Sequence, residues 1–147
     1  MAITTVKEIM TGVVEVLGVG DTLAAARRQL ARGRIRHLPV VDGNERLVGL
    51  VTHRRILESW VSHGHPDEES TGKVARDVPV EMIMGKDVLT VDPATTAAEA
   101  ARLLETYKLG CLPVVEHGKL VGIVTEADFV RFARDYFEWE MSSTHST

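Results

Sequence analysis

Two polar side chains, Thr125 and Asp128, stand where an apolar segment meets a helix-like one, in the stretch GIVTEAD. Free backbone amides and the positive end of a helix dipole gather at such a junction, and they favour an anion such as phosphate. The Thr125 hydroxyl could donate to a phosphate or ribose oxygen, and the Asp128 carboxylate could accept from both ribose hydroxyls. The same spacing is also a helix-capping arrangement that needs no ligand.

Other reactive residue types lack the partners that chemistry would require. Cys111 is the only cysteine, which excludes a disulfide within the chain and a cysteine-based zinc site. No histidine stands beside it in the sequence, so we interpret it as a small residue in a cleft wall rather than a nucleophile. No paired-carboxylate, phosphate-loop or Ser-His-Asp pattern stands out, and we expect no enzyme. A polar cluster could hold a metal, but a flexible loop explains it better and no metal site is expected; its members are His63, His65, Asp67 and Glu68.

Composition narrows the class of protein further. The chain has 147 residues, of which 44% are hydrophobic and 26% charged, as in ordinary globular domains. Its 17 basic and 21 acidic residues leave a net charge of −4, so no basic excess exists to neutralise nucleic-acid phosphates. No uncharged apolar run approaches ~20 residues, and no basic-then-apolar leader is visible at the N-terminus. We therefore expect no nucleic acid partner, no membrane span and a cytoplasmic location.

An internal repeat organises the chain. Val6–Met10 aligns with Val80–Met84, and the LPVV motif at 38–41 aligns with the same motif at 112–115. After one residue is lost in a turn, LVG and VT of the first copy align with LVG and VT of the second. So many matches in one register indicate two copies of one unit. The predicted boundaries are 6–61 for the first copy, 62–79 for an exposed polar linker and 80–140 for the second copy.

Each copy is predicted to contain an extended piece, a helix, a hairpin of two apolar strands and a second helix. We expect Thr96 to cap the first helix of the second copy, and Asp21 or Thr22 to do so in the first. Gly33 and Gly110 suit left-handed helix exits. The predicted fold class is α/β (α+β), with a small sheet and packed helices in each copy. The last helix is expected over 126–140 with an apolar stripe, as core or dimer contact, and a disordered tail over 141–147. The stripe residues are Phe129, Val130, Ala133 and Phe137, with Tyr136 and Trp139 beside them.

With two copies of IM, a helix, LPVV, a turn and LVGhVT, where h is apolar, the chain resembles a tandem pair of cystathionine β-synthase (CBS) domains. The resemblance covers about residues 6–137, as in the stand-alone two-repeat proteins of bacteria and archaea. It implies a pseudo-two-fold module that associates into a homodimeric disc. It also implies clefts for an adenosine-containing ligand, namely AMP, ADP, ATP, S-adenosylmethionine or NAD, whose binding reports energy or metabolite state to a partner protein.

The resemblance assigns roles to further residues. Thr125 and Asp128 match the family's ribose- and phosphate-binding pair, whereas Arg55 stands where the first copy would carry its aspartate. An arginine cannot accept from ribose hydroxyls, so the resemblance favours one nucleotide per chain. Cations of the first copy would reach the phosphates of that ligand, and an apolar slot would hold adenine; these residues are Arg36, His37 and Arg54, and Gly12, Val13, Val14 and Ile123.

The resemblance leaves two alternative functions open. The first is a regulatory module that binds an adenine nucleotide, AMP, ADP or ATP, between its repeats and changes its affinity for a partner protein. The second is a non-catalytic scaffold subunit whose ligand clefts are vestigial. Arg55 favours the scaffold for one cleft, and the retained Thr125 and Asp128 favour binding in the other. The alternative to phosphate binding is that Arg36, His37 and Arg54 are ordinary surface charges.

Overall fold

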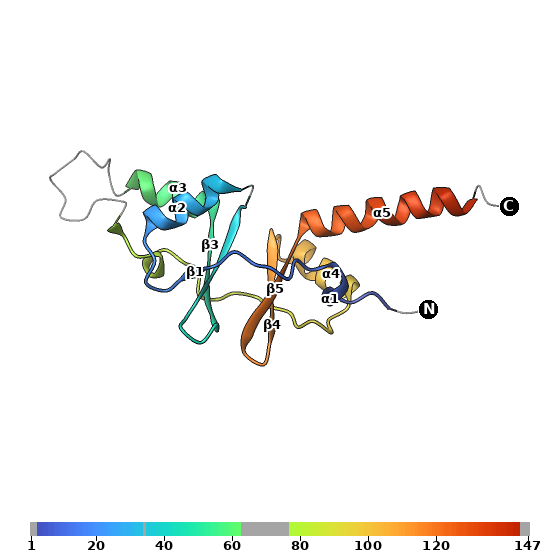
Figure 1. Ribbon diagram of the computed structural model, residues 1–147, viewed down its shortest axis with the longest axis horizontal. Coiled ribbons are helices and arrows are strands. Elements are labelled where there is room, and N and C mark those ends of the chain that lie inside the picture. Colours follow the sequence, from blue (N-terminus) through green and yellow to red (C-terminus); the bar gives the residue numbers. More distant parts are fainter. Residues whose placement is uncertain (1–2, 34, 63–76, 145–147) are drawn as a thin grey trace. The chain divides into compact units, whose positions relative to one another are not determined.

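The computed structural model describes residues 3–33, 35–62 and 77–144. Most of the predicted linker, and the candidate metal cluster within it, lie outside the described residues. The chain divides into two compact units. Unit 1 comprises residues 1–14, 89–116 and 121–147, and unit 2 comprises residues 15–88 and 117–120. Figure 1 labels the helices and strands of both units.

Unit 2 contains a three-stranded sheet with two helices. The sheet has the order β1-β2-β3, with β1 (Leu17–Gly18) parallel to β2 (His37–Val41) and β2 antiparallel to β3 (Leu47–Thr52). The helices α2 (Leu23–Arg32) and α3 (His53–Ser62) contact each other. The core combines the apolar residues of these elements with Val78, at the end of the predicted linker, and Val80, in the second repeat. Val80 begins the short 3-10 turn η2 (Val80–Met82).

Unit 1 is built in the same way from the second repeat and the N-terminal segment. It contains α1 (Val6–Ile9), α4 (Ala97–Thr106), β4 (Cys111–Glu116), β5 (Lys119–Thr125) from residue 121 onward, and α5 (Glu126–Thr144); β4 and β5 pair as a two-stranded sheet. Val6 and Ile9 of α1 lie in its core with Leu112, Val114 and Val124. The two repeats therefore exchange their first segments, since α1 belongs to the unit of the second repeat and η2 to the unit of the first.

The exchange produces equivalent contacts in the two units. Thr5 pairs with Thr96 in unit 1, and their counterparts Pro79 and Thr22 pair in unit 2. Met10 lies against Gly122, and its counterpart Met84 lies against Gly49. Because a Cβ at either glycine would meet a methionine side chain and a backbone oxygen, each strand needs glycine where the exchanged segment crosses it.

The predicted caps and hairpins are confirmed. Thr22 and Thr96 each accept a hydrogen bond from the backbone amide three residues on, at 3.3 and 3.1 Å. The middle residues of β2 and β4 are buried, as their continuous apolar runs predict. His117 and Gly118 join β4 to β5 with φ of 53° and 80°, the left-handed pair that a two-residue hairpin turn requires.

The prediction for the helix exits was wrong. Gly33 has an extended φ of −146°, and Gly118 is the glycine with positive φ in the described part of the chain. In the second repeat the left-handed residue after α4 is Lys108, with φ of 53°. Leu109 then donates from its amide to the Leu104 carbonyl at 3.0 Å, which closes the helix with the usual six-residue loop without glycine.

Helix α5 is longer and more exposed than its sequence suggests. It continues to Thr144, so the prediction of a disordered tail was wrong for residues 141–144. Phe129 packs on the core of unit 1, whereas Tyr136, Phe137 and Trp139 are exposed. Figure 1 shows the red end of α5 running clear of α1 and α4, so this chain alone leaves most of the predicted stripe uncovered. None of the helices in the described segments combines the length and apolar character that crossing a bilayer demands.

Candidate functional site

The Asp128 carboxylate is buried at the start of α5. Its residue is 4% exposed, and it is one of two buried polar or charged residues in the described chain. Oδ2 accepts from the Thr125 amide at 2.9 Å and from the Thr125 hydroxyl at 3.3 Å. Because α5 begins at Glu126, Thr125 stands at the cap position and Asp128 in the first turn. The capping arrangement predicted from the sequence is therefore present, whether or not a ligand binds.

The other carboxylate oxygen contacts two residues that the sequence analysis missed. Oδ1 accepts from Arg131 Nη2 at 2.6 Å and from the Thr11 hydroxyl at 3.4 Å. A carboxylate has about four acceptor positions, so Asp128 is saturated by its own chain. The three-residue spacing on one helix could have revealed Arg131. No local signal could have revealed Thr11, which lies 117 residues away in sequence.

The N-terminal segment brings the predicted adenine-binding residues to the same place. Thr11 and Ile123 exchange two backbone hydrogen bonds, of 2.9 and 3.0 Å, at the end of β5. Gly12 and Val13 follow directly; Val13 is 91% exposed, and a Cβ at Gly12 would meet no atom within 4 Å. Unit 1 thus gathers an open glycine and an exposed apolar side chain next to a buried carboxylate. The predicted residues that it brings together are Gly12, Val13, Ile123, Thr125 and Asp128, and Val14 follows them along the chain.

The equivalent position in unit 2 has lost its acceptor. Thr52 still caps its helix, since its hydroxyl accepts from the Arg55 amide at 3.1 Å. The Arg55 side chain donates from Nε to the carbonyl of Ile83 at 3.3 Å and lies 3.9 Å from Glu58. Gly85 pairs with Leu50 where Thr11 pairs with Ile123 in unit 1, so the Thr11 hydroxyl has no counterpart there. Arg55 therefore has a structural role. At the position where unit 1 has the acceptor Asp128, unit 2 has a hydrogen-bond donor.

The predicted phosphate-binding cations all belong to unit 2. His37 pairs in register with Thr52 at the start of β2, and the Arg36 carbonyl accepts from the His53 amide at 2.8 Å. Arg54 is 89% exposed, and its Nε lies 3.1 Å from Glu58 Oε1. These three residues therefore gather around the N-terminus of α3. The structure describes them in a different unit from Asp128, so their convergence on one ligand stays a prediction.

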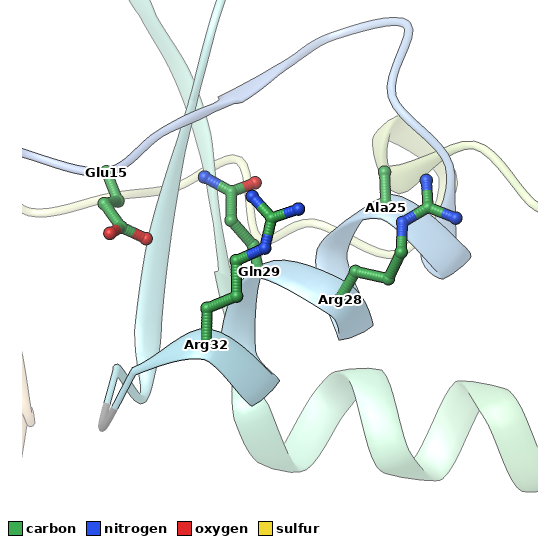
Figure 2. A pocket seen from close by; sticks show the side chains of 5 residues that line it. All are labelled: Glu15, Ala25, Arg28, Gln29 and Arg32. Carbon is green, nitrogen blue, oxygen red and sulfur yellow. The ribbon is translucent and has the colours of Figure 1, made fainter.

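Two surface pockets of unit 2 lie apart from the predicted residues. One pocket, of about 330 Å³, is lined by side chains of α2 and by Glu15. Figure 2 shows the side chains of Arg28 and Arg32 among those that line it. Its Gln29 amide donates to the Val16 carbonyl at 3.0 Å, which gives that side chain a structural role. The other pocket, of about 440 Å³, lies at the β2–β3 turn beside Lys119.

Neither a metal centre nor a reactive thiol emerges from the described residues. No group of three or more metal-ligating side chains is clustered in residues 3–33, 35–62 and 77–144. Cys111 is 3% exposed, and its burial raises the pKa of the thiol from 9.0 to about 12. The thiol is therefore protonated and inaccessible at neutral pH, which argues against a nucleophilic role.

Comparison with known sequences identifies both repeats. The family model described as CBS domain matches residues 6–62 and 75–135. Hypoxic response protein 1 of Mycobacterium tuberculosis is 32% identical over 129 residues, covering 87% of this chain and 84% of that protein. An uncharacterized protein of Methanocaldococcus jannaschii is 34% identical over 139 residues, or 90% of this chain. The chain spans about a third of that longer relative, 32% of its length.

Solved structures show the same architecture. The Vibrio cholerae protein AcuB has a TM-score of 0.82 and 33% identity, covering 96% of this chain and 98% of that one. CBSX2 in complex with AMP has a TM-score of 0.76 and 30% identity, covering 90% and 98%. The CBS domain pair of protein MJ0100, in complex with 5′-methylthioadenosine and S-adenosyl-L-methionine, has a TM-score of 0.76 and 26% identity, covering 92% and 99%.

Proposed function

The chain belongs to the CBS domain family, and on that basis we propose that it is a regulatory module that binds an adenosine-containing nucleotide and signals to a partner protein. The observation that carries this proposal is the buried Asp128 carboxylate beside Thr125 and the exposed Gly12–Val13 segment. A buried carboxylate fixed by backbone is a preorganised acceptor for a ribose diol. An open, apolar neighbourhood next to it suits the flat face of adenine.

In the proposed complex each group of residues has its own task. Asp128 accepts from the ribose hydroxyls, and Thr125 donates to a phosphate or ribose oxygen. Val13, Val14 and Ile123 cover the adenine ring, while Gly12 lets its edge approach backbone. The first-repeat cations Arg36, His37 and Arg54 serve the phosphates, since charge-assisted hydrogen bonds favour an anionic ligand. The ligands of CBSX2 and MJ0100, which are AMP, 5′-methylthioadenosine and S-adenosylmethionine, support an adenosine core.

The same assignment leads to one ligand per chain. Arg55 occupies the place of the second aspartate and is bonded to the Ile83 carbonyl, so a ribose there would meet a donor instead of an acceptor. We propose that the protein acts as a homodimer and that its ligand favours one of two conformations with different affinity for the partner protein. A ligand can shift such an equilibrium only through its differential affinity for the two states.

One observation favours a second function, a scaffold with vestigial clefts. All four acceptor positions of Asp128 are filled by Thr125, Arg131 and Thr11. A carboxylate that only caps α5 would have the same contacts. Under this alternative the protein binds its partner constitutively, and adenosine ligands change nothing.

A thermal-shift panel with AMP, ADP, ATP, S-adenosylmethionine and NAD separates the two functions. A ligand at ~100 times its dissociation constant adds about 2.7 kcal/mol to the native state, roughly 5–10 °C for a chain of this size. Asp128→Asn, which preserves shape, should abolish the shift. Arg55→Ala is the matched control at the equivalent position, and it should retain the shift. Absence of a shift with every ligand, or an equal shift in Asp128→Asn, would support the scaffold.

A further inference from the structure

We propose that Arg131 selects the class of adenosine ligand: it occupies the Asp128 carboxylate until a ribose displaces it, and it then favours ligands with an anionic 5′ group. This inference rests on the proposed function and deepens it. The structure supplies the starting point, because Arg131 Nη2 lies 2.6 Å from Asp128 Oδ1. No predicted role from the sequence involves this residue.

The two oxygens of Asp128 are held in different ways. Oδ2 accepts from the Thr125 amide at 2.9 Å and from the Thr125 hydroxyl at 3.3 Å, and this amide belongs to the backbone at the start of α5. Oδ1 is held by the Arg131 side chain and by the 3.4 Å contact from Thr11. The Arg131 side chain is 52% exposed, whereas that of Asp128 is 4% exposed. A ribose therefore gains Oδ1 most readily by displacing the arginine, which has solvent to move into.

Displacement leaves a positive charge beside the ligand. Asp135, one turn further along the helix, does not offer the displaced Arg131 a free carboxylate, because it is already bonded to Arg134 Nη2 at 3.1 Å. The 5′ carbon is attached to the same ribose ring that carries the hydroxyls on Asp128, so a phosphate on that carbon would lie near an arginine that already extends to Oδ1. A phosphate can accept two hydrogen bonds from the guanidinium. A neutral 5′ group offers no such replacement, and a sulfonium adds a second positive charge.

Isothermal titration of the full chain with AMP and with adenosine tests this inference, because the two ligands differ only in the phosphate. In Arg131→Gln we expect AMP affinity to fall at least tenfold, as for loss of a charge-assisted hydrogen bond. Adenosine affinity should stay constant or rise, because its competitor for Asp128 is gone. Arg131→Lys should retain most of the preference for AMP. Arg134→Gln removes an exposed arginine one turn away and should match the wild type.

The ratio of the two affinities distinguishes selection from a structural role. If Arg131→Gln weakens AMP and adenosine equally, Arg131 merely positions Asp128, and selection by Arg131 is refuted. An unchanged ratio with unchanged affinities refutes it as well. In both cases nucleotide binding that is lost in Asp128→Asn would leave the proposed function standing. If the wild type binds none of the adenosine ligands, the proposed function and this inference fail together.

Discussion

Replacing Asp128 by alanine in the ligand-free protein measures what the network at the start of α5 contributes to stability. The side chain is buried and accepts from Thr125, Arg131 and Thr11. Its removal leaves the Thr125 amide without an acceptor at the helix terminus. Loss of a helix cap costs about 0.5–2 kcal/mol, and a hydrogen bond to a charged group contributes about 1.5–3 kcal/mol.

The individual contributions are not additive. The Arg131 side chain is 52% exposed, so water replaces the carboxylate and little is lost there. The Thr11 contact, at 3.4 Å, is long for a hydroxyl donor and adds little. We therefore expect Asp128→Ala to lower the free energy of unfolding by about 2–3 kcal/mol. Asp128→Asn keeps an oxygen for the Thr125 amide and should cost about 1 kcal/mol.

Urea unfolding followed by far-ultraviolet circular dichroism measures these differences. Arg55→Ala is again the matched control, since its side chain is 54% exposed and makes one 3.3 Å bond to backbone. We expect it to stay within about 0.5 kcal/mol of the wild type. If Asp128→Ala proves as stable as the wild type, or more so, desolvation of the buried carboxylate outweighs its contacts, and the reasoning above is refuted.

Two further predictions concern the cores of the units. Because burial raises the pKa of Cys111 to about 12, the unfolded thiol ionises first, and stability should fall as pH rises above 9. Between pH 8 and pH 10 the loss should be about 1.4 kcal/mol, visible in urea unfolding and absent in Cys111→Ala; equal losses in both proteins would contradict the assignment. Gly122→Ala should cost about 1–3 kcal/mol, because its Cβ would lie 2.5 Å from Met10 Sδ and 3.0 Å from the Thr11 carbonyl. Gly12→Ala meets no atom within 4 Å and should leave the melting temperature nearly unchanged, so an equal loss in the two variants would refute the steric argument.

Local and repeated patterns in the sequence predicted much of the fold. The LPVV runs became strands with buried middle residues because continuous apolar stretches need cover on both faces of a sheet. The LVG runs also became strands, but their leucine and valine residues are only half-buried. Thr22 and Thr96 became caps because a threonine hydroxyl at the start of a helix can accept a hydrogen bond from a backbone amide that has no partner within the helix. The helix exits were wrong because a left-handed residue need not be glycine, and Lys108 takes that conformation.

The residues of the candidate site also differ in whether their partners are near or far in the sequence. Thr125 and Asp128 were identified from the sequence because their hydrogen bonds span three residues, and Arg131 follows the same local spacing. Thr11 and Arg55 acquire their partners from segments 117 and 28 residues away. Residue types at a repeat position could show that Arg55 replaces an aspartate, but not that it donates to a backbone carbonyl.

Residue types and their spacing thus suffice for the strands and the caps, which depend on neighbours within a few residues, and for the repeat, which shows in the sequence as matches in one register. The repeat also shows that Arg55 stands where the second copy has Asp128. The exchange of α1 and η2 between the units depends instead on how distant apolar segments share cores. That exchange places Thr11, Gly12 and Val13 beside β5 and Asp128. Contacts between residues far apart in the sequence determine which segment completes the site, and these contacts form only in the folded chain.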